Sequence, residues 1–213
     1  MIPKVIHQVW VGDKRIPKHI KEWMQEIKDA HADYEYHFWH DGNLNKLPER
    51  LQFIYDSLDQ PAMKCDLLRV YLCYTYGGIY LDVDYKLITK LDNLYIYQDI
   101  EAAFLYNDSE SIHDINNSFI ASVKGSYLLK HLLSCITHEK QWLGPHWFGE
   151  SILKYLDLNI GTNDKELVSA CDRMGIKALN WDTINRDVIR HDFLASWYPN
   201  SEWNLKLQTD DYE

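Results

Sequence analysis

Two aspartates near the middle of the chain have a spacing that suits metal binding. Asp82 and Asp84 are separated by one residue and follow the segment Gly-Gly-Ile-Tyr-Leu at 77–81. In extended chain, side chains two residues apart point to the same side, so both carboxylates face one site. They repel each other unless a cation lies between them, and hard oxygen ligands suit Mg²⁺ or Mn²⁺. The pattern therefore predicts a divalent metal site at the end of a buried strand, with ordinary exposed aspartates as the alternative.

A second pair of charged residues lies upstream. Asp66 and Arg69 are three residues apart in a predicted helix and share one of its faces. If that face meets the end of the strand, Asp66 can accept a hydrogen bond from a ribose or sugar hydroxyl. Arg69 can bind a phosphate or orient a carboxylate. A local ion pair between the two is the alternative.

The elements that must position these residues alternate between strand and helix. The helix that carries Arg69 starts at Pro61 and ends at Gly77 and Gly78, because glycine readily adopts the left-handed conformation of a helix cap. Strands are predicted at 5–10, 34–39, 79–81, 85–88, 102–106, 118–121 and, as the last strand, 177–180; further helices are predicted at 17–30, 51–58, 128–138, 148–156 and 165–174. The pattern predicts an α/β fold in a single domain over residues 1–213, with a polar tail from about residue 200.

The bulk composition limits the partners. The 213 residues carry a formal net charge of −10, which argues against nucleic-acid binding. A phosphate-bearing substrate would then need a cation, which carboxylates can hold. The four cysteines have no zinc-type spacing and are expected to be free thiols. No signal peptide or spanning segment is recognised, so we expect a cytoplasmic protein without membrane insertion, possibly one domain of a larger polypeptide.

Two stretches resemble the motifs of a known family. Residues 2–10, Ile-Pro-Lys-Val-Ile-His-Gln-Val-Trp, resemble its opening motif, and Ala62, Asp66, Leu67, Arg69 and residues 77–84 resemble its centre. The family is that of DXD-type nucleotide-sugar glycosyltransferases. It includes fungal initiating mannosyltransferases, bacterial capsular sugar transferases, the catalytic domains of clostridial glucosylating toxins and small relatives in chlorella viruses. The resemblance is strong over residues 1–85 and extends thinly to about residue 200.

The resemblance implies a GT-A fold, which is a Rossmann-like mixed sheet flanked by helices. It implies Mn²⁺ or Mg²⁺ as cofactor and a nucleotide-sugar donor, with a UDP-sugar such as UDP-glucose favoured. The acceptor would be a hydroxyl of a glycan or protein-linked glycan. For a viral protein, the place of action would be the host cytoplasm.

The resemblance also implies roles for single residues. Val9 and Trp10 would contact the base, and Asp66 and Arg69 would hold the donor sugar or ribose. Asp82 would face the sugar and ribose, and Asp84 would bind the metal directly.

Later motifs match the family less closely. Residues 144–148, Gly-Pro-His-Trp-Phe, resemble an element that closes over the donor, and residues 191–197 resemble a His…Ser-Trp ending. In that ending His191 would be a further metal ligand, while Ser196 and Trp197 would close over the diphosphate. Packing in the core or a place on the surface is the alternative for His191, and core packing is the alternative for Trp197.

The mechanism expected from these residues is sugar transfer to a hydroxyl. The metal, with Lys14 or Arg15, would neutralise the leaving diphosphate; a solvated turn is the alternative for these two cations. If the reaction inverts the anomeric configuration, a carboxylate must act as base. The candidate bases are Asp192, Asp108, Asp114 and Glu150. Asp82, Asp84 and Asp192 are expected to be the catalytic residues.

Other functions use the same residues. A nucleotide-sugar hydrolase would use the same metal site with water as acceptor, and a non-catalytic sugar-binding module would keep only aromatic contacts to sugar. A magnesium phosphotransferase is disfavoured because Lys86 stands where its motif requires Thr or Val.

Overall fold

The computed structural model describes residues 1–107, 115–137 and 143–191. A mixed sheet of six strands crosses the middle of this part of the chain, in the order β2-β1-β3-β6-β5-β7. The strands are β1 (Val5–Val9), β2 (Glu35–Trp39), β3 (Gly78–Leu81), β5 (Ala102–Tyr106), β6 (Ile115–Ser122) and β7 (Ile176–Asn180). β1 is parallel to β2 and to β3, β6 is antiparallel to β3 and β5, and β7 is parallel to β5. The predicted Rossmann-like mixed sheet is confirmed.

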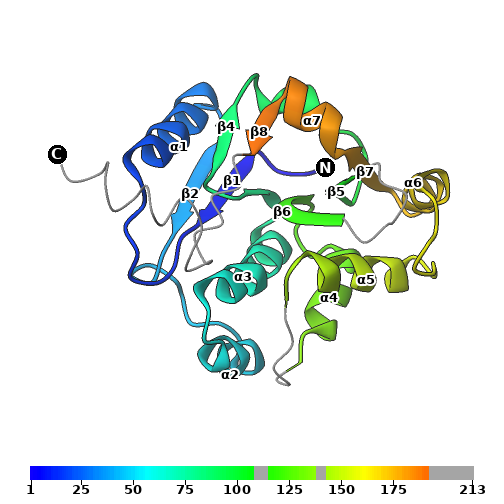
Figure 1. The fold of residues 1–213 in the computed structure, drawn as a ribbon, viewed down its shortest axis with the longest axis horizontal. Helices are drawn as coiled ribbons and strands as arrows, with labels where there is room; N and C mark the ends of the chain where they lie inside the picture. The colour runs from blue at the N-terminus through cyan, green and yellow to red at the C-terminus, as the bar shows by residue number, and fades with distance from the viewer. Residues whose placement is uncertain (108–114, 138–142, 192–213) are drawn as a thin grey trace.

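Helices cover both faces of the sheet (Figure 1). On one face lie α2 (Glu49–Ser57), α3 (Pro61–Tyr76), α4 (Tyr127–Cys135) and α5 (Pro145–Tyr155), whose buried residues form the larger core cluster with the sheet. On the other face lie α1 (Lys18–Ala30), the 3₁₀ helix η1 (Leu91–Leu94) and α7 (Trp181–Asp187). The helix α6 (Asp164–Arg173) packs beside β7.

A second, two-stranded sheet lies next to α1 and α7 (Figure 1). It consists of β4 (Tyr85–Leu87) and β8 (Ile189–His191), which pair antiparallel with Tyr85 opposite His191. β4 follows the two aspartates after β3, so this small sheet brings residues near 190 back to the middle of the chain.

Two glycines allow β3 to start where it does. Gly77 and Gly78 have φ angles of 71° and 98°, a region that side chains disfavour. A Cβ atom at Gly78 would lie 2.5 Å from the carbonyl oxygen of Val5 in β1. The chain can therefore reverse directly from α3 into β3 and lie close against β1 only with glycine at this position.

A buried histidine joins three elements at the same end of β3. The Trp39 indole donates to His7 Nδ1 at 3.1 Å, and His7 Nε2 lies 2.8 Å from the Gly77 carbonyl oxygen. Since a carbonyl only accepts, Nε2 carries the proton and the imidazole is neutral. Burial lowers the pKa of His7 to about 4, and the Gly77 carbonyl only partly opposes this effect.

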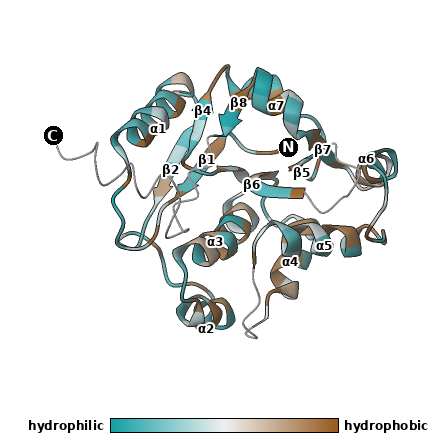
Figure 2. Cartoon of the chain, in the orientation of Figure 1, coloured by the Kyte–Doolittle hydropathy of each residue, from teal (hydrophilic) through white to brown (hydrophobic). Residues whose placement is uncertain are grey.

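The structure corrects the sequence prediction at its C-terminal side. Residues 177–180 were expected to form the last strand, but α7 and β8 follow them. α7 has only seven residues, with Trp181 and Ile184 buried, and is mostly hydrophilic in Figure 2. Such a short segment shows no full amphipathic period, and β8 has three residues, so neither leaves a pattern to detect. Several other elements start earlier than predicted: α2 at Glu49, α5 at Pro145 and β6 at Ile115.

All four cysteines are free thiols, as predicted. In the described ranges, no helix has both the length and the apolar character needed to cross a membrane.

We predict that Gly78→Ala destabilises the protein by about 3 kcal/mol, because the added Cβ meets the β1 backbone at a positive φ angle. Gly125→Ala is the matched control: Gly125 has a φ of 76°, but a Cβ there has no neighbour within 4 Å. This control should lose only about 1 kcal/mol. Urea unfolding of both variants measures the difference, and equal losses would show that the approach to β1 is not tight.

We also predict that protonation of His7 destabilises the fold in acid. Between pH 6.5 and about 4 the unfolded histidine binds a proton that the folded one does not. The stabilisation is therefore complete above pH 6.5 and falls with pH, by about 3 kcal/mol at about 1.4 kcal/mol per pKa unit. As the pH falls over this range, the free energy of unfolding of the wild type should drop toward that of His7→Gln, which lacks the titrating group. His40→Gln, at an exposed histidine, should keep the wild-type slope; a wild-type slope in His7→Gln would contradict the prediction.

Candidate active site

The two aspartates of the central motif lie in the turn between β3 and β4. The Asp82 backbone N–H donates to the Ser118 carbonyl of β6 at 2.9 Å, which holds the turn against the sheet. Val83 packs with Ile20 and Met24 of α1. This packing anchors the turn on α1. Asp84 is buried, whereas the Asp82 side chain keeps 24% of its surface exposed.

A histidine from the far end of the described chain joins the aspartates. His191 Nε2 lies 3.0 Å from Asp84 Oδ1 and 3.9 Å from Asp82 Oδ2. The imidazole stacks on the Tyr85 ring at 4.6 Å, and its backbone N–H donates to Asn185 Oδ1 at 2.8 Å. Pairing of β8 with β4 thus places His191 beside residues that precede it by more than a hundred positions.

These three side chains fit a divalent metal ion. One ligand atom from each of Asp82, Asp84 and His191 lies within 4.8 Å of the others. Two carboxylates and an imidazole suit Mn²⁺ and leave positions for other ligands. Burial lowers the pKa of His191, but the hydrogen bond and charge of Asp84 outweigh burial and raise it overall. A bound cation would replace that proton, since only neutral imidazole binds a metal.

A buried arginine holds the carboxylates from the α3 side. Arg69 donates to the Asn117 carbonyl at 2.7 Å, and its Nη2 lies 3.2 Å from Asp66 Oδ1 and 3.3 Å from Asp82 Oδ1. Its guanidinium also lies 4.9 Å from the centre of the Tyr80 ring. Of the two predicted roles, these contacts suit the orientation of carboxylates, because the guanidinium is already engaged inside the protein.

The cluster carries an excess of negative charge. Burial raises the pKa of Asp66 to about 6, although the charge of Arg69 opposes the shift. Burial also raises the pKa of Asp82, again against Arg69, and the charge of Asp84 adds to the rise. Three carboxylates lie close together and the Arg69 guanidinium contacts two of them, Asp66 and Asp82, so the site favours a further cation.

The residues predicted to bind the nucleotide lie at the end of β1 and in the following loop. Val9 is buried in the larger core cluster, and the Trp10 indole donates to the Lys14 carbonyl at 2.7 Å. Lys14 is exposed. Their positions at the carboxyl end of β1 match the place where open α/β sheets bind ligands.

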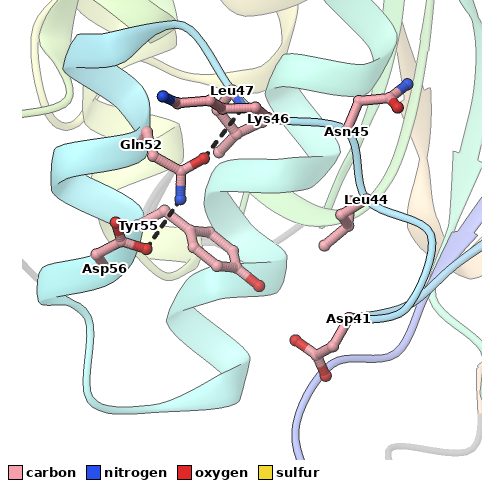
Figure 3. A pocket seen from close by; sticks show the side chains of 8 residues that line it. All are labelled: Asp41, Leu44, Asn45, Lys46, Leu47, Gln52, Tyr55 and Asp56. Carbon is pink, nitrogen blue, oxygen red and sulfur yellow. Dashed lines mark hydrogen bonds between the residues drawn. The ribbon is translucent and has the colours of Figure 1, made fainter.

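A hollow of about 500 Å³ opens beside this loop (Figure 3). Its lining consists of Asp41, Leu44, Asn45, Lys46, Leu47, Gln52, Tyr55 and Asp56. The Tyr55 side chain points toward Asp41 in this view, and Asp41 Oδ2 accepts a hydrogen bond of 2.7 Å from the Gly12 N–H. A hydrogen bond thus joins the loop after β1 to a residue that lines the hollow.

Other predicted residues are either outside the part of the chain that the structure describes or outside the cluster. Asp192, Ser196, Trp197, Asp108 and Asp114 are outside the described residues. Glu150 is exposed on α5, whereas Trp147 and Phe148, from the motif expected to close over the donor, pack in the core.

Sequence reasoning missed three residues of the cluster. Asn117 Nδ2 donates to Asp66 Oδ1 at 2.8 Å, the Tyr80 hydroxyl donates to Asp82 Oδ1 at 2.5 Å, and the Tyr85 hydroxyl lies 2.7 Å from Ser118 Oγ. The sequence held one signal for Asn117. Three polar residues, Asn116, Asn117 and Ser118, stand near the start of the otherwise apolar strand β6. Because β6 runs antiparallel to β3, the start of β6 lies next to the aspartates that follow β3.

Comparison with known proteins gives relatives of one kind. The chain is 32% identical to a mannosyl phosphorylinositol ceramide synthase of Saccharomyces cerevisiae, over 68% of this chain and 38% of that protein. It is 24% identical to an uncharacterized glycosyltransferase of Acanthamoeba polyphaga mimivirus, over 94% of this chain and 85% of that protein. The chain thus spans little more than a third of the fungal relative.

A solved structure shares the fold. The PaToxG glycosyltransferase superposes with a TM-score of 0.58 at 16% identity, over 81% of this chain and 76% of that one. The likeness confirms the predicted GT-A fold.

The family model described as "Glycosyltransferase sugar-binding region containing DXD motif" matches residues 17–106, which include Asp66, Arg69, Asp82 and Asp84. The family resemblance seen in the sequence is confirmed over residues 17–106, which are similar to the DXD-containing sugar-binding regions of glycosyltransferases.

Proposed function

We propose that this protein is a metal-dependent glycosyltransferase that moves a sugar from a nucleotide-sugar to an acceptor hydroxyl. The observation that carries the proposal is the meeting of Asp82, Asp84 and His191 at the end of β3. The two aspartates lie in the region, residues 17–106, that matches the glycosyltransferase family model. Three ligand atoms on one side of a cluster with excess negative charge suit a cation that also contacts an anionic substrate.

In this proposal Asp82, Asp84 and His191 hold Mn²⁺ or Mg²⁺. When bound, the ion supplies positive charge to the diphosphate that leaves. Arg69 keeps Asp82 in place and favours its ionised form against the effect of burial, because its guanidinium contacts that carboxylate at 3.3 Å. Asp66, oriented by Asn117 and Arg69, accepts a hydrogen bond from the donor sugar or ribose.

The nucleoside part of the donor lies at the carboxyl end of β1 in this proposal. The base lies at Val9 and Trp10, next to the hollow that Asp41 lines, and Lys14 reaches a phosphate. Ser196 and Trp197 close over the diphosphate, as the family resemblance implies. Asp192 is the candidate base if the reaction inverts the anomeric configuration.

The motif resemblance and the names of the fungal relatives point to different donors and acceptors. The motif resemblance favours a UDP-sugar such as UDP-glucose and a glycan or protein-linked glycan acceptor. The fungal relatives are named for mannosyl transfer to inositol phosphoceramide. We therefore propose a hexosyl donor with uridine favoured, and experiments should include GDP-mannose and inositol beside UDP-glucose and simple glycans.

The place of action that we propose is the cytoplasm. The support is that Cys65, Cys73, Cys135 and Cys171 are all unpaired, as in proteins of reducing compartments. Thiol titration of the denatured, unreduced protein from its natural source should give four free thiols, and disulfides there would contradict the proposal.

Donor binding should require both the metal and Asp84. We expect UDP or GDP to bind in calorimetric titrations with Mn²⁺ and to lose about 100-fold in affinity with EDTA or in Asp84→Asn, a loss of about 3 kcal/mol. Asp59→Asn is the control, because Asp59 is exposed before α3, and it should bind as the wild type does. Circular dichroism verifies that each variant is folded. Metal-independent binding would count against the metal site and favour a sugar-binding module.

Turnover should depend on an acceptor. A glycosyltransferase hydrolyses its donor slowly in water alone, so adding the right sugar or polyol should accelerate nucleotide release at least about tenfold and yield a glycosylated product. The measurement is nucleotide release and product mass across a panel of acceptors. Fast release that no acceptor changes would identify a nucleotide-sugar hydrolase instead.

A further inference from the structure

The backbone of Asp82 is held from both sides of β3. Its N–H donates to the Ser118 carbonyl in β6 at 2.9 Å. Its carbonyl accepts a hydrogen bond of 3.2 Å from Gln8 Nε2 in β1. This second contact comes from a side chain because the β1–β3 ladder pairs only Ile6 with Ile79 and His7 with Tyr80. Beyond that point the strands no longer pair, and Gln8 bridges the gap.

A tyrosine of β2 fixes the orientation of the Gln8 amide. The Tyr36 hydroxyl lies 2.5 Å from Gln8 Oε1. The Asp82 carbonyl can only accept, so the amide nitrogen must face it and the amide oxygen must face Tyr36. The tyrosine hydroxyl is therefore the donor. Burial raises the pKa of Tyr36, which keeps that proton in place.

Gln8 has no solvent to replace either partner. Its side chain is fully buried, so an amide that loses Tyr36 leaves an unsatisfied oxygen inside the protein. Turning the amide over would place its oxygen against the Asp82 carbonyl oxygen. One orientation is thus far more stable than the other, and it points the donor at the first aspartate of the metal site.

We propose that Tyr36 and Gln8 form a positioning relay that sets the backbone of Asp82 and, through it, the geometry of the metal ligands. Neither side chain of the relay belongs to the proposed set of metal ligands. The consequence for metal affinity rests on the proposed function, whereas the consequence for the Asp82 carbonyl does not. In this role β2, an outer strand of the sheet, controls a site that it does not contact.

The test compares Tyr36→Phe, Gln8→Met and the double variant with Tyr97→Phe as matched control. The Tyr97 hydroxyl donates to Tyr34 at 2.7 Å in a half-buried pair away from Asp82, so its loss costs a similar hydrogen bond. We expect Tyr36→Phe and Gln8→Met each to raise the Mn²⁺ dissociation constant about tenfold by electron paramagnetic resonance. The double variant should be no weaker than Gln8→Met, because both changes break one relay. Tyr97→Phe should bind Mn²⁺ as the wild type does.

A second readout needs no metal. The carbonyl ¹³C resonance of Asp82 in the apo protein should move upfield in Tyr36→Phe and Gln8→Met, as for a carbonyl that loses a hydrogen bond, and stay in place in Tyr97→Phe. An unchanged resonance, or Mn²⁺ losses that multiply in the double variant or are equalled by Tyr97→Phe, would overturn the relay. If the resonance moves but the wild type binds no Mn²⁺, the relay stands and the proposed metal site fails.

Discussion

The buried guanidinium of Arg69 is the interaction on which the site depends. It lies within 3.3 Å of carboxylates from both α3 and the turn after β3, and it donates to a carbonyl of β6. An isolated buried charge is costly, so these groups are tolerated only together. Arg69 contacts Asp66 and Asp82, whereas Asp84 is paired with His191. The same arrangement therefore accounts for the structural charge pairing and for the proposed cation site.

The sheet topology explains why the aspartates can be held so closely. β1 lies between β2 and β3, and two adjacent residues of β1 bind the two ends of β3: His7 at the Gly77 carbonyl and Gln8 at the Asp82 carbonyl. Each of them receives a hydrogen bond from β2, from Trp39 and Tyr36. The opening motif of the sequence, with its His-Gln pair, therefore acts on the central motif through the backbone, and the two glycines make that close approach possible.

The sequence predicted what depends on local pattern. The α/β fold class, the helix that carries Arg69 and the strand before Asp82 all follow from apolar periodicity, glycine and proline, whereas the mixed sheet was implied by the family resemblance. The contribution of His191 was suggested only by family resemblance, because 107 residues separate it from Asp84 and β8 is too short to show a pattern. Asn117 and Gln8 were missed for a related reason: each acts across strands, and a single sequence does not contain the register that decides which residues meet. The fold class is thus a local property, whereas the site depends on pairing.

The proposed third metal ligand, His191, lies on β8, which with β4 is one of the two shortest strands in the described part of the chain. β8 has three residues and pairs with a three-residue strand, and an isolated two-stranded sheet is only marginally stable in water. This sheet is supported by Tyr85 and Ile189, which are buried in the core. The end of β8 is also held by the stacking of His191 on Tyr85, its edge contact with Trp181 and its hydrogen bond to Asp84. An ion that binds Asp82, Asp84 and His191 favours the state in which β8 is docked, since a ligand stabilises the conformation that it binds. Conversely, undocking of β8 removes one of three ligands. Metal affinity and the order of residues 181–191 are therefore linked, because the same contact between β4 and β8 serves both.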